Sequence, residues 1–513
     1  GIIENYIELK NSQLKQGYEF TSETDTEVIA HAIDLEMKSS ISLVESVQKA
    51  VKSLEGSYGL GVISSTFPDR IIATRKGSPL LIGIGEKGNY IASDQMALLS
   101  VTKNFIFLED GDIAEIKINQ VRVFDKNGFL VNREIKTTKL KKGQVDKGPY
   151  DHFMQKEIFE QPQAIRDTLE SRVTKNQIVL SAFGKNATKI FSKIKQIQIV
   201  ACGTSYHAGI VAKYWLEDIA KIPCNIEVAS EYRYRHPIIL NKTLFVCLSQ
   251  SGETADTLEA LKTAKEINEN IQTLCITNSL ESSLSRISDF TFITHAGPEI
   301  GVASTKAFTS QLVALALLTS AIGKIKGSIS KSQEKDIVEG LQKLPGLIDE
   351  TLLQENQIKK LATCFKEKTS ALFLGRGTMH AIALEGALKL KEISYIHAEA
   401  YPAGELKHGP IALIDKNMPV IAIAPNDELI DKLKSNLQEV KSRGSQMIVF
   451  EDANSMVEPM DAIEIIPVTA NLGRITAPII FTIPLQLLSY HVALIKGTNV
   501  DKPRNLAKSV TVE

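Results

Sequence analysis

The later part of the chain repeats one pattern of apolar and helical segments at an offset of 173 to 177 residues. The paired segments are 197–201 with 371–374, 243–248 with 420–424, 273–277 with 446–450, 290–293 with 463–466, and 304–321 with 477–494. Short apolar runs bounded by Gly or Pro that alternate with helical patterns are typical of a parallel sheet covered by helices. The repeat therefore predicts two copies of one α/β unit, with ligands beyond the carboxyl ends of the strands.

Charge and cysteine content narrow the function classes. The chain has 59 Lys and Arg residues against 60 Asp and Glu residues. Because these nearly cancel, nothing draws the chain to nucleic acid or to an anionic membrane, and a small ligand is favoured. The five cysteines have no CxxC spacing, so we expect a reduced, cytoplasmic protein without disulfides or a metal site. The uncharged stretch 475–495 could span a membrane by length, but its prolines and polar residues favour a buried core helix.

The chain of 513 residues is long enough for about three domains. The first part differs from the rest in its pattern of predicted strands and helices. The predicted parts are 1–138, an α+β region; 139–148, a linker; 149–340 and 341–500, the first and second α/β copies; and 501–513, a tail. One long helical pattern near 26–54 interrupts the strands of the α+β region. A helical lead-in over 154–169 opens the first copy. Apolar Leu506, Val510 and Val512 predict that the tail docks instead of fraying.

Two turns in the first copy place small hydroxyl residues at strand ends. Backbone N–H groups at a helix amino terminus, together with Ser and Thr hydroxyls, can hold a phosphate without a lysine. In any single turn such residues more often cap the helix, but two turns at adjacent strand ends favour a phosphorylated ligand. The candidate binding residues are Cys202, Gly203, Thr204 and Ser205 in one turn, Ser249, Gln250, Ser251 and Thr254 in the other, and Val302, Ala303 and Ser304, which could close the same pocket.

The second copy has a helix with an unusual face. Glu385, Lys389 and Glu392 share an arc of roughly 60° on a helical wheel, and almost every other position of 382–393 except Lys391 is apolar. A solvated stripe of ion pairs usually comes with a broad polar face, which this helix lacks. A narrow charged seam on a mostly buried helix costs desolvation and is a common sign of a functional site. We therefore favour a site over a stripe.

Two further residues could take part in chemistry, although each has a plainer interpretation. His408, in the turn 403–410, could carry a proton near neutral pH, but a single histidine is more often structural. Lys508, in the tail, could form an imine with a carbonyl if docking partly desolvated it. The alternative for Lys508 is an ordinary solvated lysine.

Six segments taken together resemble one family. They are CGTS from 202, SQSGETADT from 249, GVASTKAFT from 301, ALEGALKLKEISYIHAEAY from 383, AGELKHGP from 403 and DKPRNLAKSVTVE from 501. In these segments the chain is similar to the glutamine:fructose-6-phosphate aminotransferases (isomerizing), and the match stays in register over the whole chain. The resemblance implies two tandem SIS (sugar isomerase) domains, each flavodoxin-like with a parallel sheet, after part of a class II glutamine amidotransferase domain of the Ntn type. The implied reaction converts fructose 6-phosphate and glutamine to glucosamine 6-phosphate and glutamate.

The resemblance also implies roles for the candidate residues. Lys508 would form an imine with the C2 carbonyl of the opened sugar, and Glu392 would move a proton between C1 and C2. His408 would open the sugar ring, reaching in from the second subunit of a homodimer, while Glu385 and Lys389 support the site. Ser249, Gln250, Ser251 and Thr254 would hold the sugar phosphate, and the rest of the substrate site would be lined by 202–205, 302–304 and Ala507. No metal or organic cofactor is required, because the lysine is the electron sink, and we expect no nucleic-acid or membrane partner.

In the α+β region the resemblance is partial. Asp25 matches a residue that holds the glutamine α-amine, and Gly1 matches the glycine of an oxyanion-binding Asn-Gly pair. The family splits glutamine with a cysteine at the mature amino terminus, whereas the first cysteine here is Cys202. We therefore expect the sequence as given to isomerise fructose 6-phosphate without splitting glutamine, and to need free ammonia to aminate it. Two alternatives are a sugar-phosphate isomerase with no role for glutamine and a non-enzymatic sugar-phosphate sensor.

Overall fold

The computed structural model describes residues 1–138, 146–455, 457 and 463–511. These residues form two compact units. The first unit holds the chain from Gly1 to Asp146, with Glu253–Ala255 and the end of the chain from Val510. The second holds Lys147–Gly252 and Asp256–Ser509. Most of the predicted linker, 139–145, lies outside the described residues, so the linker stays a prediction.

The first unit contains two antiparallel sheets, as expected for an α+β region. One sheet has the order β1 (Ile2–Ile3), β2 (Gly56–Val62), β3 (Arg70–Lys76), β7 (Ile113–Lys117), β8 (Gln120–Phe124), β9 (Leu130–Val131). The other has the order β10 (Ile135–Thr137), β6 (Asn104–Phe107), β4 (Leu81–Gly85), β5 (Gly88–Ala92). Strands of both sheets share one buried apolar cluster that includes Ala73, Ile82, Ile106 and Ile116. The sheets therefore pack face to face.

The prediction of one long helix near 26–54 was wrong. The segment forms two helices, α2 (Glu27–Met37) and α3 (Leu43–Ala50), which share a buried cluster with strands of the six-stranded sheet. The side chain of Ser42 accepts a hydrogen bond from the backbone N–H of Glu45 and starts α3 as an N-cap. A further helix, α1 (Tyr6–Lys15), was not predicted; it buries only Gln13 and has no continuous apolar face.

The second unit contains two parallel sheets of five strands with the same order, which confirms the repeat. The first copy has the order β12 (Cys224–Val228), β11 (Gln196–Ala201), β13 (Thr243–Leu248), β14 (Gln272–Thr277), β15 (Phe290–Ile293). The second has the order β17 (His397–Pro402), β16 (Ser370–Gly375), β18 (Val420–Ala424), β19 (Met447–Glu451), β20 (Ile463–Pro467). Every pairing within these two sheets is parallel. The carboxyl ends of the strands in each copy therefore share one edge.

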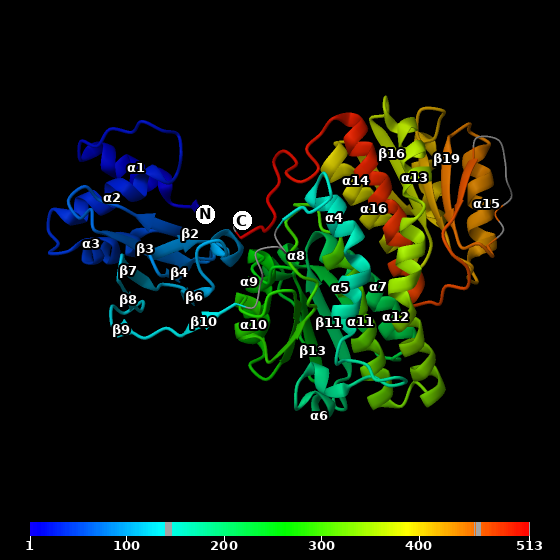
Figure 1. Cartoon of the computed structure of the whole chain (residues 1–513), viewed down its shortest axis with the longest axis horizontal. Helices are drawn as coiled ribbons and strands as arrows, with labels where there is room; N and C mark the ends of the chain where they lie inside the picture. Colours follow the sequence, from blue (N-terminus) through cyan, green and yellow to red (C-terminus); the bar gives the residue numbers. More distant parts are fainter. Residues whose placement is uncertain (139–145, 456, 458–462, 512–513) are drawn as a thin grey trace. The chain divides into compact units, whose positions relative to one another are not determined.

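Long helices join the two copies around one large apolar core. The helices of this core include α7 (Gly203–Asp218), α11 (Lys306–Lys326), α12 (Lys331–Leu352), α14 (Thr378–Ser394) and α16 (Thr476–Lys496). In Figure 1 α16, drawn in red, runs beside α14, and the two helices are in contact. By length and composition alone α11 and α16 could cross a membrane, but 89% of each apolar window is buried inside the protein. Both are core helices, as we expected for 475–495.

The second unit also contains α6 (Ala187–Phe191), α8 (Ala229–Tyr234), α9 (Ala255–Ile267), α10 (Ser283–Ile287), α13 (Glu355–Ala362) and α15 (Ile430–Lys441). The lead-in expected as one helix over 154–169 is two, α4 (Phe153–Phe159) and α5 (Gln161–Leu169). They meet at Glu160, two residues before Pro162, which lies in the first turn of α5. The boundary predicted at 340/341 stays a prediction, and α12 runs across it.

Candidate active site

The charged seam on α14 is buried. The Lys389 ammonium lies 2.6 Å from Glu392 Oε2 and 3.4 Å from Glu385 Oε1. The side chains of Lys389 and Glu385 are each 1% exposed, whereas that of Glu392 is 22% exposed. Burial alone would lower the pKa of Lys389, but the two carboxylates outweigh it and hold the pKa above its ordinary value. The seam is thus an ion cluster inside the protein with one member, Glu392, reaching accessible space.

The first copy completes this cluster through α7. The Thr204 hydroxyl donates to Glu385 Oε1 at 3.0 Å and accepts from the Lys389 ammonium at 3.1 Å. His207 Nδ1, one turn along α7, lies 2.8 Å from the other Glu385 oxygen. Because α7 follows β11 and α14 follows β16, the first helix of each copy contributes to one site. The sequence analysis did not single out His207, whose role depends on a partner in the other copy.

The tail is docked through polar contacts. The Asp501 carboxylate accepts from the backbone N–H groups of Phe153 and Met154, at 3.0 and 2.9 Å, at the start of α4. The backbone N–H of Arg504 donates to the Tyr395 hydroxyl at 2.8 Å, and the Arg504 guanidinium lies 4.2 Å from the Tyr395 ring centre. The prediction that the tail docks is confirmed, but these contacts are polar, whereas the prediction rested on apolar residues.

The apolar tail residues do not hold the tail in place. Leu506 and Val510 remain 45% and 55% exposed, and Val512 lies outside the described residues. Ala507 is also exposed. The docked backbone instead presents Lys508, whose side chain is 22% exposed, to the first copy.

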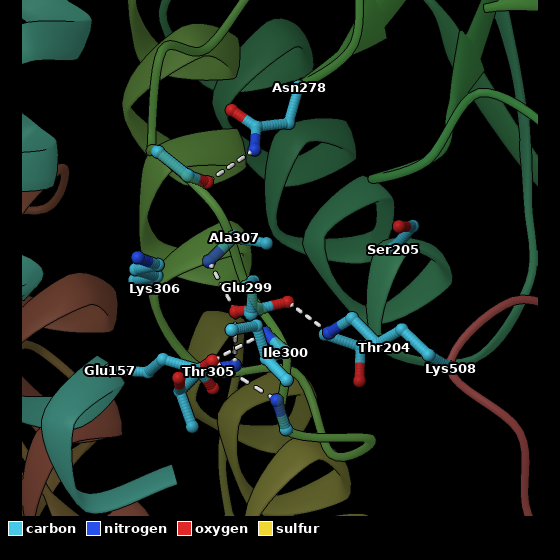
Figure 2. Close-up of polar contacts among 12 residues, drawn as sticks. Glu157, Thr204, Ser205, Asn278, Glu299, Ile300, Thr305, Lys306, Ala307 and Lys508 are labelled. Atoms are coloured by element: carbon cyan, nitrogen blue, oxygen red, sulfur yellow. Dashed lines mark hydrogen bonds and ion pairs between the residues drawn. The ribbon is translucent and has the colours of Figure 1, made fainter. Parts of the chain in front are cut away.

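Lys508 meets a buried carboxylate that the sequence analysis missed. Its ammonium lies 2.6 Å from Glu299 Oε2, and Figure 2 shows the lysine reaching Glu299 from the tail. The other Glu299 oxygen accepts from the backbone N–H groups of Thr305 and Ala307, at 2.9 and 3.0 Å. Burial would raise the pKa of Glu299, but Lys508 and these N–H groups outweigh it and lower the pKa. The pair is a charged amine and its counter-ion beyond the end of β15.

The two hydroxyl turns lie at the same sheet edge, because they follow the neighbouring parallel strands β11 and β13. Ser205 accepts from Gln311 Nε2 at 3.0 Å, and the buried Ser249 hydroxyl accepts from the Gly252 backbone N–H at 3.0 Å. Gly203 has a φ of 51°, which favours glycine at the start of α7. Ser249 therefore shapes its own turn and does not cap α9, which begins at Ala255.

The remaining candidates of the second unit differ in their surroundings. The Gln250 carbonyl accepts from the Asn278 backbone N–H at 2.9 Å, which joins the ends of β13 and β14. The Val302 backbone N–H donates to the Asp501 carbonyl at 3.0 Å, next to buried Ala303 and half-buried Ser304. His408 is exposed, and no hydrogen bond or ion pair within the described part of the chain links it to the ion cluster. The structure thus brings Lys508 to the first copy and leaves His408 outside the cluster.

The two glutamine-binding candidates lie near each other in the first unit. The Ile3 backbone N–H donates to Asp25 Oδ2 at 2.6 Å, and Gly1 directly precedes β1. A side chain at Gly1 would collide with the carbonyl oxygen of Ser57 on β2. Among the described residues no group of three or more His, Cys, Asp and Glu side chains could hold a metal ion.

Comparisons with known proteins assign both units. The SIS domain family matches residues 190–321 and 365–496, and the glutamine amidotransferase domain family matches residues 1–100. The chain is 55% identical over 515 aligned positions to a glutamine–fructose-6-phosphate aminotransferase [isomerizing] of Pseudomonas putida. It is 54% identical to the protein of that name from Escherichia coli K12. In both cases the match covers 100% of this chain and 84% of the relative.

The chain belongs to the glutamine–fructose-6-phosphate aminotransferase (isomerizing) family. Among solved structures it resembles the C-terminal domain of a glucosamine-fructose-6-phosphate aminotransferase from Francisella tularensis, with 52% identity and a TM-score of 0.68. That match covers 70% of this chain and all of the other. The predicted fold of two SIS domains after a glutamine amidotransferase region is confirmed. In this family member the ion cluster on α7 and α14 and the Lys508–Glu299 pair both lie within the second unit, which contains the two SIS domains.

Proposed function

We propose that this chain takes part in its family's conversion of fructose 6-phosphate and glutamine to glucosamine 6-phosphate and glutamate. Its two SIS domains carry the ketose–aldose chemistry, and the sequence as given uses free ammonia, because its first cysteine is Cys202. One observation carries the assignment of the site: the Lys508 ammonium is 2.6 Å from buried Glu299. Glu299 precedes the segment 302–304, which is one of the predicted substrate-binding segments. The backbone N–H of Val302 in this segment donates to the carbonyl of Asp501 in the tail, so the tail and the loop that carries Glu299 lie together. The hydroxyl turns would hold the sugar phosphate.

Lys508 is the proposed nucleophile. Glu299 takes a proton from the ammonium, and the free amine adds to the C2 carbonyl. Glu299 then returns the proton as water leaves, which gives a protonated imine on C2. Ammonia can displace the lysine from this imine and leave nitrogen on C2. The imine draws electrons from C1, so the chemistry needs no other electron sink.

Glu392 is the proposed base. Of the three charged side chains on α14 it is the most exposed, and Lys389 orients its carboxylate from 2.6 Å. It would remove a proton from C1 and return one to C2, while the C1 hydroxyl loses its proton and becomes an aldehyde. Glu385 and Lys389 would act through Glu392 by holding it in place.

We further propose that the protein is a cytoplasmic homodimer in which His408 of the partner subunit opens the sugar ring. The exposure of His408, and the lack of any described contact between it and the ion cluster, favour action across a subunit boundary. The five cysteines are all free thiols, which fits a reducing compartment.

Borohydride trapping tests the imine. The protein is incubated with fructose 6-phosphate and sodium borohydride, digested, and searched by mass spectrometry for a reduced sugar adduct. We expect the adduct on Lys508, none in Lys508→Ala, and an unchanged yield in Lys502→Ala, which removes an exposed lysine of the same tail. An adduct that persists in Lys508→Ala would overturn the assignment.

A further inference from the structure

Glu157 on α4 is a second buried carboxylate beside the Lys508–Glu299 pair. It is 2% exposed. Its Oε1 atom accepts from the backbone N–H groups of Ile300 and Gly301, at 2.5 and 3.0 Å. These are the two residues that follow Glu299, and Figure 2 shows Glu157 next to this stretch. Glu157 therefore fixes the loop that presents Glu299 to Lys508.

The second oxygen of Glu157 is unusual. Oε2 is buried and has no hydrogen-bond partner among the residues that the structure describes. It points at the Cα of Gly301, where a Cβ would lie 2.8 Å away. A carboxylate oxygen that is buried without a donor is costly, whereas a protonated carboxyl carries no charge to solvate. The site therefore favours a proton on Glu157.

The charges around Glu157 act in both directions, and their net effect with burial also favours a proton on it. Glu299 faces it from the loop and Lys508 from the tail. At the two ends of α4, Asp501 accepts from the Met154 backbone N–H, and Glu160 is paired with Lys306 at 2.7 Å. Burial and the negative charge of Glu299 raise the pKa of Glu157 to about 7, although Lys508 and the two loop N–H groups oppose them. Glu157 thus changes its charge near neutral pH.

We propose that Glu157 is a positioning residue for the amine of Lys508: it clamps the loop that carries Glu299, and the proton on its unpaired oxygen sets how much negative charge holds Lys508 as an ammonium. With Glu157 protonated, Lys508 faces one carboxylate and gives up its proton more readily. With Glu157 ionised, it faces two and is held in its unreactive form. The inference deepens the proposed function and rests on it for its catalytic meaning.

The test measures Lys508 reactivity in the absence of sugar. The whole protein is acetylated competitively with acetic anhydride at pH 6 and at pH 8, and acetylation of Lys508 is quantified by mass spectrometry. Glu157→Gln keeps an oxygen for the loop N–H groups but cannot ionise. We expect this variant to react roughly ten-fold faster than the natural protein at pH 8, because a negative charge is gone. At pH 6, where Glu157 is already protonated, the two should agree within about two-fold.

Two other variants separate charge from clamping. Glu160→Gln removes a carboxylate at the far end of α4 and should leave Lys508 reactivity unchanged at both pH values. Glu157→Asp keeps a charge but is too short to clamp the loop, so its Lys508 should differ from that of the natural protein at both pH values. Equal reactivity of Glu157→Gln and the natural protein at pH 8 would overturn the proposal. So would an increase of the same size in Glu157→Gln at pH 6, which would mean that the effect does not come from the charge of Glu157.

The catalytic consequence has its own readout. The rate of glucosamine 6-phosphate formation from fructose 6-phosphate and added ammonium should lose an inflection near pH 7 in Glu157→Gln, because the group that titrates there is absent. If borohydride trapping fails in the natural protein, the proposed function fails, while the acetylation result still decides whether Glu157 controls Lys508.

Discussion

The two SIS domains have the same strand order but different residues at the ends of equivalent strands. After β13 the first domain continues with Ser249, Gln250 and Ser251, whereas after β18 the second continues with Pro425, Asn426 and Asp427. After β14 comes Asn278, but β19 ends in Glu451 and is followed by Asp452. Uncharged donors favour a phosphate and carboxylates repel it. We therefore expect the turns, and not the sheet, to decide which domain binds the sugar phosphate.

The second domain uses its strand-end carboxylates for its own structure. Asp452 is fully buried and accepts from the backbone N–H groups of Asn454 and Leu472, at 3.0 and 3.1 Å. Glu451 accepts from the backbone N–H of Val457 at 2.9 Å. Its contribution to chemistry comes instead from α14. A duplicated fold has thus divided the work, with anion binding proposed for one copy and proton transfer for the other.

The largest effect is expected at Lys508, which enters from the tail after the second domain and pairs with the first. Lys508→Arg keeps a positive charge for Glu299 but cannot form an imine. We expect formation of glucosamine 6-phosphate from fructose 6-phosphate and added ammonium to fall by at least about a thousand-fold in kcat, measured by chromatographic detection of the amino sugar. Lys502→Arg serves as the control. Retention of a tenth of the activity by Lys508→Arg would show that the positive charge suffices and remove the covalent step.

A substitution that makes the first domain resemble the second should have the next largest effect. Ser251→Asp places a carboxylate in the proposed phosphate seat, where the second domain has Asp427 after the equivalent strand. We expect the KM for fructose 6-phosphate to rise roughly a hundred-fold with a smaller change in kcat, since binding of the dianion is opposed. The reverse change, Asp427→Ser, should leave KM within about two-fold. An unchanged KM in Ser251→Asp would place the phosphate elsewhere.

The sequence predicted the parts of this division that lie within one segment. The repeated apolar runs predicted eight of the ten parallel strands. The helical-wheel pattern of α14 identified Glu385, Lys389 and Glu392 as one charged face. The edge strands β12 and β17 were missed, because they carry polar residues such as Asn225, Glu227 and Glu399 and are only partly buried. An edge strand lacks the continuous apolar run of a central one.

Residues whose role needs a distant partner could not be predicted. Glu299 lies in a loop without helical or strand periodicity, and its partner Lys508 is 209 residues away. His207 and Glu385 are separated by 178 residues. Neither pair leaves a local spacing signal, because the contact exists only once the two domains pack and the tail docks. The apolar residues of the tail predicted docking for the wrong reason, since polar contacts hold it.

A third prediction concerns the contact at which the two domains share the ion cluster. Thr204→Val keeps the shape of the side chain but removes the hydroxyl that donates to Glu385 Oε1 and accepts from the Lys389 ammonium. We expect kcat to fall roughly thirty-fold as Glu392 loses its fixed position, with the melting temperature lowered by a few degrees. Thr319→Val is the matched control, because the Thr319 hydroxyl is buried in α11 without a partner among the described residues. Equal kcat values for the two variants would mean that Thr204 is not coupled to the base.

The smallest effect is expected from variants that weaken the contacts of one domain at a time with the tail. Tyr395→Phe, in the second domain, removes the acceptor of the Arg504 N–H but keeps the ring beneath its guanidinium. A net hydrogen bond contributes about 1 kcal/mol, so we expect a two- to five-fold loss of kcat and faster proteolysis of the tail.

Asp501→Asn weakens the contact of the tail with the first domain, where the Asp501 carboxylate accepts from two backbone N–H groups at the start of α4. Because a negative charge is stabilising at a helix amino terminus, we expect Asp501→Asn to release the tail more than Tyr395→Phe does. Equal release in both variants would mean that neither domain dominates and that Lys508 is placed by the Glu299 pair itself.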